Sequence, residues 1–296
     1  MNYLGKYLQM PPTFEKLKKL ELILEKEGYS LERDLGLILQ CAYFAYDVTP
    51  YDVITFASTG CDGIHFGLLT DFGTVSDLED AFVVCISPMD FGSHIKIVAR
   101  NIREFVGLIC TMKDAVTVSN FNHMKEEEEY LRLLKKLKQE DSENEEYIER
   151  ANYVAEKIKS AIGCEIIEDV YHYVEKKVLA EREKQIIVPT LDGIGIITFE
   201  NVNSSHTIYK LEEDVNIDLN EIKSFFNNST TESKLAFIRD AQFTLLISNE
   251  IELKELVMNE MIQLGLNDEV NRLRNIDQSN LPESNSFSTS AFLELD

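Results

Sequence analysis

The order of apolar and polar positions predicts three helices at the start of the chain, over residues 13–28, 31–46 and 50–59. Leucines recur every three or four positions in the first of these segments, which places them on one face of a helix. Thr49 is the candidate N-cap of the third helix, Pro50 suits its first position, and Gly60 is placed to end it.

From residue 63 the pattern changes from helical spacing to short β-rich runs. Three such runs, bounded by Gly, Asp or Pro, predict strands over residues 63–70, 81–88 and 95–100. Residues 101–112 then carry apolar side chains on one helical face. Helices that flank a short sheet define the α+β class. The sequence therefore predicts an α+β domain with a mixed or antiparallel sheet over residues 1–124.

Residues 125–184 differ in composition, because they are highly charged and almost free of Gly and Pro. Apolar stripes predict two or more helices here, with breaks near residues 140–146 and at Gly163. No heptad repeat is sustained, which argues against a long coiled coil. The acidic runs at 126–129 and 140–146 are candidate partner surfaces, although a solvated helix face is the simpler explanation.

The C-terminal part begins with a predicted β-hairpin over residues 185–200, in which residues 191–193 form the turn between two β-branched runs. Helical patterns return over residues 218–274. Asp218 and Asn249 are candidate caps for the first and last of these helices. A largely helical region with one hairpin is therefore expected after the charged segment.

The last residues, 277–296, are rich in Ser and Asn and contain no Lys or Arg. This composition predicts a disordered acidic tail, because the segment has too little apolar surface to bury. The resulting organisation has four segments, at residues 1–124, 125–184, 185–276 and 277–296.

Acidic residues greatly outnumber basic ones, since 52 Asp and Glu against 29 Lys and Arg give a net charge of -23. This excess argues against nucleic acids and anionic membranes as partners, because both attract clustered Lys and Arg. A basic protein partner, or solubility alone, agrees better with the charge.

The targeting and cysteine patterns indicate a cytoplasmic protein. The N-terminus has no apolar core followed by a cleavage pattern, and no run reaches the roughly 18 apolar residues of a membrane span. The five cysteines are odd in number and widely spaced, without a CxxC pair. This spacing argues against a disulfide framework or a structural zinc site, and the four thiols that sit beside apolar neighbours are expected to be buried and free.

Residues 59–73, TGCDGIHFGLLTDFG, hold the densest group of candidate functional residues. The DFG triplet at 71–73 occurs in kinases, but the Gly-rich loop, strand Lys and HRD-type loop of a kinase are missing. The glycines fit neither GxGxxG nor a P-loop. Cys61 and His65 form the nearest Cys–His pair, yet no orienting group or oxyanion site accompanies them. Turns at both ends of a strand explain the glycines and aspartates without any chemistry.

A metal-dependent hydrolase is the alternative interpretation of this region. Carboxylates and imidazoles that suit divalent ions are supplied by Asp62, His65, Asp71, Asp90 and His94. If residues 63–70 form a strand, however, Asp62 and Asp71 lie at its opposite ends. Turn aspartates and a half-exposed His65 are the simpler explanation.

Arg100 and Asn101 stand at the predicted junction between the last strand and the helix that follows it. A charged residue at such a junction commonly pairs with a nearby acid or caps the helix. Glu104 and Asp90 are the two candidate acids, and structural ion pairing is favoured over contact with a ligand.

Three ordered segments, TPYDVITFASTGCDGIHFGLLTDFG, DLEDAFVVCISPMDFG and IVARNIREFVGL, carry a resemblance to a known family. Over residues 49–108 the chain resembles the SUKH superfamily, which includes yeast cell-wall assembly regulators and bacterial immunity proteins. The resemblance implies a binding scaffold with a sheet-lined concave face, which in bacteria often neutralises a toxin domain by direct contact. The family is defined by its shape, so the resemblance transfers no residue roles.

We therefore expect a non-enzymatic protein-binding module without a cofactor, acting as an immunity or regulatory protein on another protein such as a basic toxin or nuclease. The candidate binding residues are Asp62, His65, Asp71, Asp90, His94, Arg100 and Asn101. The alternatives are the metal-dependent hydrolase and a structural subunit of a larger assembly that makes its contact through residues 125–184.

Overall fold

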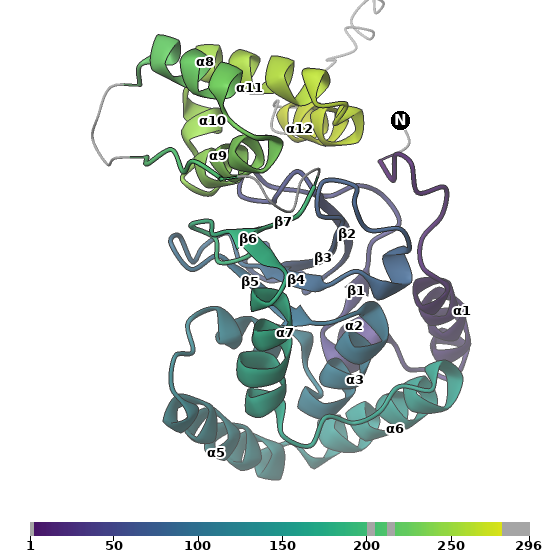
Figure 1. The fold of residues 1–296 in the computed structure, drawn as a ribbon. Coiled ribbons are helices and arrows are strands. Elements are labelled where there is room, and N and C mark those ends of the chain that lie inside the picture. The colour runs from purple at the N-terminus through teal and green to yellow at the C-terminus, as the bar shows by residue number, and fades with distance from the viewer. Residues whose placement is uncertain (1–2, 200–204, 212–216, 280–296) are drawn as a thin grey trace, which may run out of the picture.

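A five-stranded sheet lies at the centre of the computed structural model, which describes residues 3–199, 205–211 and 217–279 (Figure 1). The strands are β1 (Ile38–Leu39), β2 (Val53–Ser58), β3 (His65–Leu69), β4 (Val83–Ile86) and β5 (Ile95–Ala99). They follow the chain in order, and each neighbouring pair is antiparallel. An antiparallel order of this kind needs only turns and short loops between strands.

Helices from residues 12–162 lie on one face of the sheet. These helices are α1 (Pro12–Lys26), α3 (Ile102–Met112) and α6 (Glu145–Ile162), and α6 packs against the other two. Phe56 of β2 and Phe66 of β3 contact Phe105 of α3, with ring centroids 5.4 and 4.7 Å apart. Buried aromatic rings contribute large apolar areas, so this contact is central to the core.

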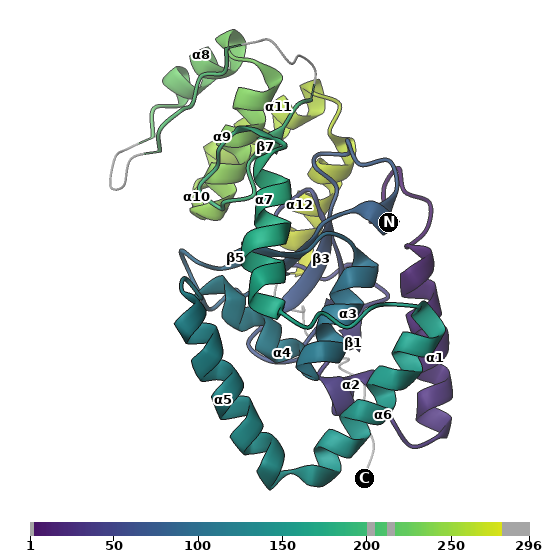
Figure 2. The ribbon, with the colours of Figure 1, turned by 60° about the horizontal axis from the view of Figure 1, so that its bottom comes forward.

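Shorter and more peripheral helices complete the part of the chain up to residue 183. They are α2 (Leu31–Leu35), η1 (Leu78–Asp80), α4 (Ala115–Val118), η2 (Ser119–Asn122), α5 (Glu127–Glu143), η3 (His172–Val178) and α7 (Leu179–Glu183). Helices α5 and α6 form a hairpin at the edge of the molecule (Figure 2). Among the side chains of α5 that the structure describes, only Tyr130 is buried. Helix α5 therefore contributes little to the core.

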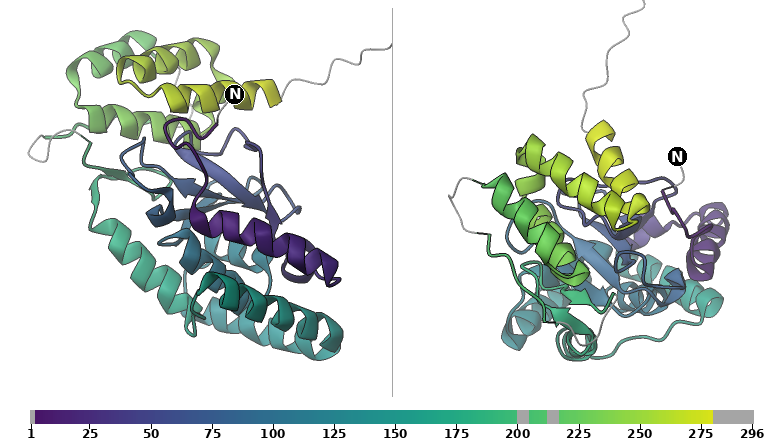
Figure 3. Two further views of the ribbon diagram at one scale, coloured as in Figure 1. Left: turned by 90° about the vertical axis from the view of Figure 1, so that its right-hand side faces the viewer. Right: turned by 45° about the horizontal axis from the view of Figure 1, so that its top comes forward.

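The C-terminal half covers the opposite face of the sheet (Figures 1 and 3). Its elements are β6 (Ile186–Val188), β7 (Ile196–Ile197), α8 (Leu219–Asn228), α9 (Thr231–Phe243), α10 (Leu246–Asn249), α11 (Ile251–Gln263) and α12 (Asn267–Ser279). Ile194 belongs to the core that contains the sheet, and Phe243 and Leu245 pack against it. All residues of β2, β3 and β4 are buried. These three strands consequently offer no open face to a partner.

The buried apolar residues form two clusters. The larger one contains the sheet together with helices from both the 1–124 and the 125–184 segments. The second cluster joins Ala45, Tyr51 and Phe72 to the β6–β7 hairpin and the C-terminal helices. The DFG turn therefore contributes to the C-terminal core through its phenylalanine. Within the described residues, no helix has both the length and the apolar content needed to cross a membrane.

The predicted α+β class is confirmed, and the five-stranded sheet is antiparallel. The runs at 63–70, 81–88 and 95–100 form β3, β4 and β5. The helix predicted over residues 50–59 is wrong, because Val53–Ser58 is the buried strand β2. β-branched and aromatic side chains fill this segment, and pairing with both neighbouring strands favours the extended form. Pro50 lies in the preceding turn, where its carbonyl accepts a hydrogen bond from the amide of Val53.

Two other helix boundaries differ from the prediction. The helix expected over residues 31–46 ends at Leu35, because Gly36 has a φ of 62° and terminates it. Asn249 is the last residue of α10 and not the cap of α11, which follows Glu250.

The remaining C-terminal predictions have mixed outcomes. Asp218 does cap α8, since its carboxylate accepts the amide hydrogens of Asn220 and Glu221. Residues 277–279 belong to α12, so the predicted tail does not begin at residue 277. The rest of that tail, residues 280–296, lies outside the described residues.

Candidate functional site

The DFG turn after β3 is stabilised by a buried ion pair. Asp71 and Phe72 have φ angles of 48° and 51°. This left-handed backbone conformation is unfavourable for residues other than glycine. The Asp71 carboxylate accepts hydrogen bonds from both terminal nitrogens of Arg182, at 2.8 and 2.6 Å. Arg182 of α7 is 1% exposed and also donates to the carbonyls of Ile194 and Gly195. Asp71 therefore connects the sheet to α7 and to the hairpin and is not available to a ligand.

A second group of buried charges joins the start of β2 to α9. Arg239 of α9 pairs with Asp52 and Asp192, and its Nη1 lies 3.3 Å from Oδ2 of Asp192. Burial alone would lower the pKa of Arg239, but the neighbouring carboxylates outweigh burial and raise it. Burial raises the pKa of Asp52. Because charges taken out of water need partners, these pairs fix how the two halves of the molecule pack.

The sequence prediction missed Arg182 and Arg239, the two arginines of these ion pairs. Arg239 does leave a signal, because it stands within the apolar run LAFIRDAQF. A guanidinium in a buried helix requires a buried acid. The acids themselves could not be identified from the sequence, since Asp52 and Arg239 are 187 positions apart.

His65, expected to be half exposed, is fully buried in β3. Its Nδ1 lies 2.7 Å from the carbonyl oxygen of Gly63, and its Nε2 lies 2.9 Å from the hydroxyl of Thr49. Burial lowers the pKa of His65 to about 4, so the imidazole is neutral at neutral pH. Cys61 is exposed and its thiol contacts Asp62 at 3.5 Å; three of the five thiols are buried, and not the four expected. Both nitrogens of His65 thus have structural contacts, and the Cys61–His65 pair does not form.

Asp90 and His94 lie in or beside the turn between β4 and β5 but have different surroundings. Asp90 accepts a hydrogen bond from Ser87 and pairs with Nε2 of His123 at 2.9 Å. Burial would raise the pKa of Asp90, but these two hydrogen bonds lower it. His94 is fully buried, and its ring stacks on Phe243 of α9 with centroids 4.3 Å apart. His94 therefore packs between the sheet and the C-terminal helices.

Arg100 and Asn101 have structural partners at the start of α3. Arg100 forms ion pairs with Glu104 and Glu181, the second at 3.2 Å. Of the two acids considered, Glu104 is confirmed, and Asp90 is not the partner. Asn101 is the N-cap of α3, because its side-chain oxygen accepts the amide hydrogen of Glu104 at 2.9 Å.

The seven candidate residues do not form one site. Asp62 lies in the turn before β3 and Asp71 in the turn after it, at opposite ends of the strand. In the described part of the chain, no group of three or more His, Cys, Asp or Glu side chains could hold a metal ion. These residues therefore do not supply the set of metal ligands that a metal-dependent hydrolase would need.

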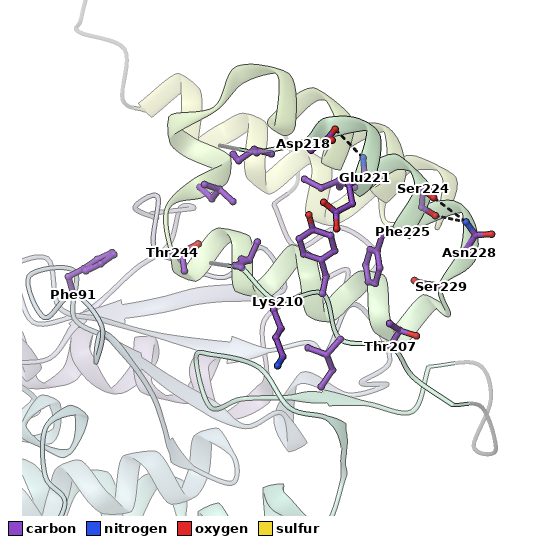
Figure 4. A pocket seen from close by; sticks show the side chains of 16 residues that line it. Phe91, Thr207, Lys210, Asp218, Glu221, Ser224, Phe225, Asn228, Ser229 and Thr244 are labelled. Carbon is purple, nitrogen blue, oxygen red and sulfur yellow. Dashed lines mark hydrogen bonds between the residues drawn. The ribbon is translucent and has the colours of Figure 1, made fainter. Parts of the chain in front are cut away.

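A cleft of about 1060 Å³ lies elsewhere, between α8, the end of α9, α10 and the extended segment 205–211 (Figure 4). Its apolar lining includes Phe91, Ile208, Tyr209, Ile217, Phe225 and Leu246. Phe91, from the β4–β5 turn, is 64% exposed. Binding sites are concave and mostly apolar, with a few polar groups for orientation. This cleft, which the sequence did not predict, is the candidate binding site.

The aromatic wall of the cleft rests on the C-terminal core. The ring of Tyr209 lies 5.2 Å from the rings of both Phe225 and Phe237, in edge-to-face contact. Glu221 of α8 contributes acidic charge to the lining, and Figure 4 shows Lys210 directed away from it. Apolar rings and separated charges favour binding over proton transfer.

No protein-family model matches the chain, and no curated protein matches it. The SUKH resemblance over residues 49–108 therefore stays a prediction. The function has to be inferred from the cleft, from the surface charge and from the arrangement of the sheet.

Proposed function

We propose that the chain is a non-enzymatic protein-binding module whose cleft receives an apolar or aromatic segment of another protein. The observation that carries this proposal is the cleft of about 1060 Å³ with its aromatic lining. Phe91 and Ile208 at this cleft are 64% and 47% exposed. Exposed apolar side chains that line one cleft are typical of a binding site.

Charge supports a basic partner. The chain carries a net charge of -23, and Asp218 and Glu221 add acidic groups beside the aromatic lining. Complementary charge speeds the encounter of two proteins and is screened by salt. The proposed partner is therefore a basic protein such as a toxin or nuclease. The chain would act on it in the cytoplasm as an immunity or regulatory protein.

The SUKH resemblance supports this class of function but suggests a different binding face. The resemblance implies contact through the concave face of the sheet. In this chain the central strands offer no open face, because all residues of β2, β3 and β4 are buried. We therefore assign partner binding to the cleft beside the C-terminal helices.

A structural subunit of a larger assembly is a second candidate function, favoured by α5. Leu131 of this helix is exposed, and Leu134 and Leu137 are half-buried. Such a helix face is suited to contact with another copy or another protein. Light scattering of the purified chain gives the mass in solution, and a monomer at micromolar concentration argues against self-association through α5.

The test of the cleft uses the full tagged chain to capture proteins from its native host at low and high salt. The cleft variant combines Phe91→Ser with Ile208→Ser, two changes at exposed positions that leave the core intact. The matched control is Leu8→Ser, which is 89% exposed and does not line the cleft. We expect one protein to be recovered with the wild type and the control, and lost with the cleft variant.

The recovered protein is then purified and its affinity is measured by calorimetry. We expect the cleft variant to bind at least about tenfold more weakly, since loss of an apolar side chain that acts as a hot spot costs about 2 kcal/mol or more. Binding should also weaken as salt rises. Equal affinity of the cleft variant and the wild type would exclude the cleft as the binding site.

A further inference from the structure

Two of the five cysteines, Cys110 and Cys164, come together between α3 and the segment that follows α6. Cys110 lies in the last turn of α3, and Cys164 follows Gly163, whose φ of 73° ends α6. Both side chains are 5% exposed. Sγ of Cys110 lies 3.9 Å from the carbonyl oxygen of Ala155 in α6. The thiol of α3 thus faces the helix that precedes the second cysteine.

The segment after α6 lies directly against α3. A Cβ atom built on Gly107 of α3 would lie 2.2 Å from the carbonyl oxygen of Glu165 and 3.9 Å from Cβ of Cys164. The amide of Ile167 donates to the hydroxyl of Thr111 at 3.0 Å. The backbone can approach this closely because residue 107 has no side chain. Cys164 is therefore within reach of the last turn of α3.

The two thiols differ in ease of ionisation. A hydrogen bond between them raises the pKa of Cys110 and lowers the pKa of Cys164. Arg103 and Lys159 also lower the pKa of Cys164, while burial opposes them. The thiolate is the form of cysteine that reacts with peroxides. Cys164 is consequently the better nucleophile and Cys110 the adjacent resolving thiol.

We propose that Cys110 and Cys164 are an oxidative modification site, a dithiol that closes to an intramolecular disulfide with hydrogen peroxide as the oxidant. The Cys164 thiolate attacks a peroxide oxygen and becomes a sulfenic acid as the O–O bond breaks, and the departing hydroxide takes up a proton to form water. The sulfur of Cys110 then attacks the sulfenic sulfur. An S–S bond forms, the S–O bond breaks, and the released hydroxide takes the thiol proton to form a second water.

The disulfide would connect α3 to the end of α6 and enclose α5 and α6 in one covalent loop. Closing a loop restricts the unfolded chain and so stabilises the folded one. Oxidation therefore restrains the α5–α6 hairpin, which otherwise has a single buried side chain along the described part of α5.

The experiment uses the full chain with the exposed cysteines removed, as the variant Cys41→Ser/Cys61→Ser. After treatment with hydrogen peroxide, intact mass should fall by two hydrogen atoms. Tryptic digestion without reductant should yield the peptide 104–113 linked to the peptide 160–176. In the wild type, oxidation of the exposed thiols shows that the peroxide is active.

Single changes in the same background assign the bond. Cys110→Ala and Cys164→Ala should each abolish the mass decrease, whereas Cys85→Ala, a buried cysteine in β4, should leave it unchanged. The oxidised chain should unfold several degrees above the reduced one. Absence of the linked peptide in the chain that retains both cysteines, or over-oxidation of either thiol without a disulfide, would overturn the proposal. This mapping does not depend on the folding of any single variant.

Discussion

At the scale of single residues, the pair Asp71–Arg182 is the clearest case of charges removed from water. Their side chains are 6% and 1% exposed, and both oxygens of the carboxylate are hydrogen-bonded. The attraction between two buried charges offsets the cost of removing them from water only while both are present. Loss of one partner leaves the other buried and unpaired, which costs more than removing the pair.

We expect Asp71→Asn to lower the free energy of unfolding by about 3–5 kcal/mol, because it leaves the Arg182 guanidinium unpaired. Arg182→Met should cost a similar amount, and the double variant should lose clearly less than the sum of the two. Urea denaturation measures all three. The control Asp62→Asn, in the exposed turn before β3, should change stability by no more than about 0.5 kcal/mol. Additive losses in the double variant would show that the two groups are not coupled.

His65 gives a second prediction at this scale, concerning pH. Its pKa is about 4 in the folded chain, below the 6.5 of an ordinary histidine. The unfolded chain therefore binds a proton first as pH falls, and the contribution of His65 to stability is full above pH 6.5 and lost towards pH 4. Asp240 acts in the opposite direction, because burial raises its pKa to about 6 and the folded chain takes up that proton first.

The effect of His65 is isolated by comparison with His65→Gln. Between pH 6.5 and pH 4 the stability difference between wild type and variant should change by about 3 kcal/mol, the equivalent of the pKa difference. Urea denaturation at several pH values gives this number. Proton NMR should show one imidazole signal that titrates near pH 4 and is missing in the variant. A signal for His65 that titrates near pH 6.5 would contradict the buried geometry.

At the scale of elements, the close contact between α3 and the segment after α6 predicts whether alanine at position 107 raises or lowers the free energy of unfolding. Alanine normally stabilises a helix by about 1 kcal/mol relative to glycine. At Gly107, however, the new Cβ would lie 2.2 Å from the carbonyl oxygen of Glu165, which is backbone and cannot rotate away. We expect Gly107→Ala to lower the free energy of unfolding by about 1–3 kcal/mol.

Chemical denaturation of Gly107→Ala, with Arg103→Ala in the same helix as the control, tests this expectation. Arg103 is partly exposed, and its loss removes only a surface ion pair with Glu79 and a long hydrogen bond to the carbonyl of Ile162, so it should cost no more than about 1 kcal/mol. An alanine at position 107 that stabilises the chain would mean that the segment after α6 does not lie against α3.

The same elements show what local pattern could and could not predict. β3, β4 and β5 were predictable because β-rich runs bounded by turn residues carry their own signal. β2 was not, because Thr49 and Pro50 match a helix start, whereas pairing with β1 and β3 decides the structure. The candidate site failed for a similar reason. Asp71 pairs with Arg182, which lies 111 positions away, and a single sequence does not reveal such a partner. Asp62 and Asp90 have partners close in sequence, Cys61 and Ser87, but the sequence does not show that these contacts are structural.

At the scale of the whole molecule, the C-terminal helices and the sheet are joined by polar contacts as well as by apolar packing. Gln242 of α9 accepts the amide hydrogen of Tyr51 at 3.1 Å, and Arg272 of α12 donates to the carbonyl of the same residue. Arg239 pairs with the adjacent Asp52. These contacts form only when both halves are folded and packed together, so unfolding of one half removes hydrogen-bond and ion-pair partners from the other.

We therefore expect the two hydrophobic clusters to unfold together, in one transition with equal calorimetric and van't Hoff enthalpies. Arg239→Met removes the charge that neutralises Asp52 and Asp192, so it should lower the unfolding midpoint and make the transition broader or biphasic. Arg274→Met, an exposed arginine of α12, is the matched control and should leave the transition unchanged. Scanning calorimetry and far-UV circular dichroism follow both variants. Two separate transitions in the wild type would mean that each cluster is stable alone and that the ion pairs between the halves only orient them.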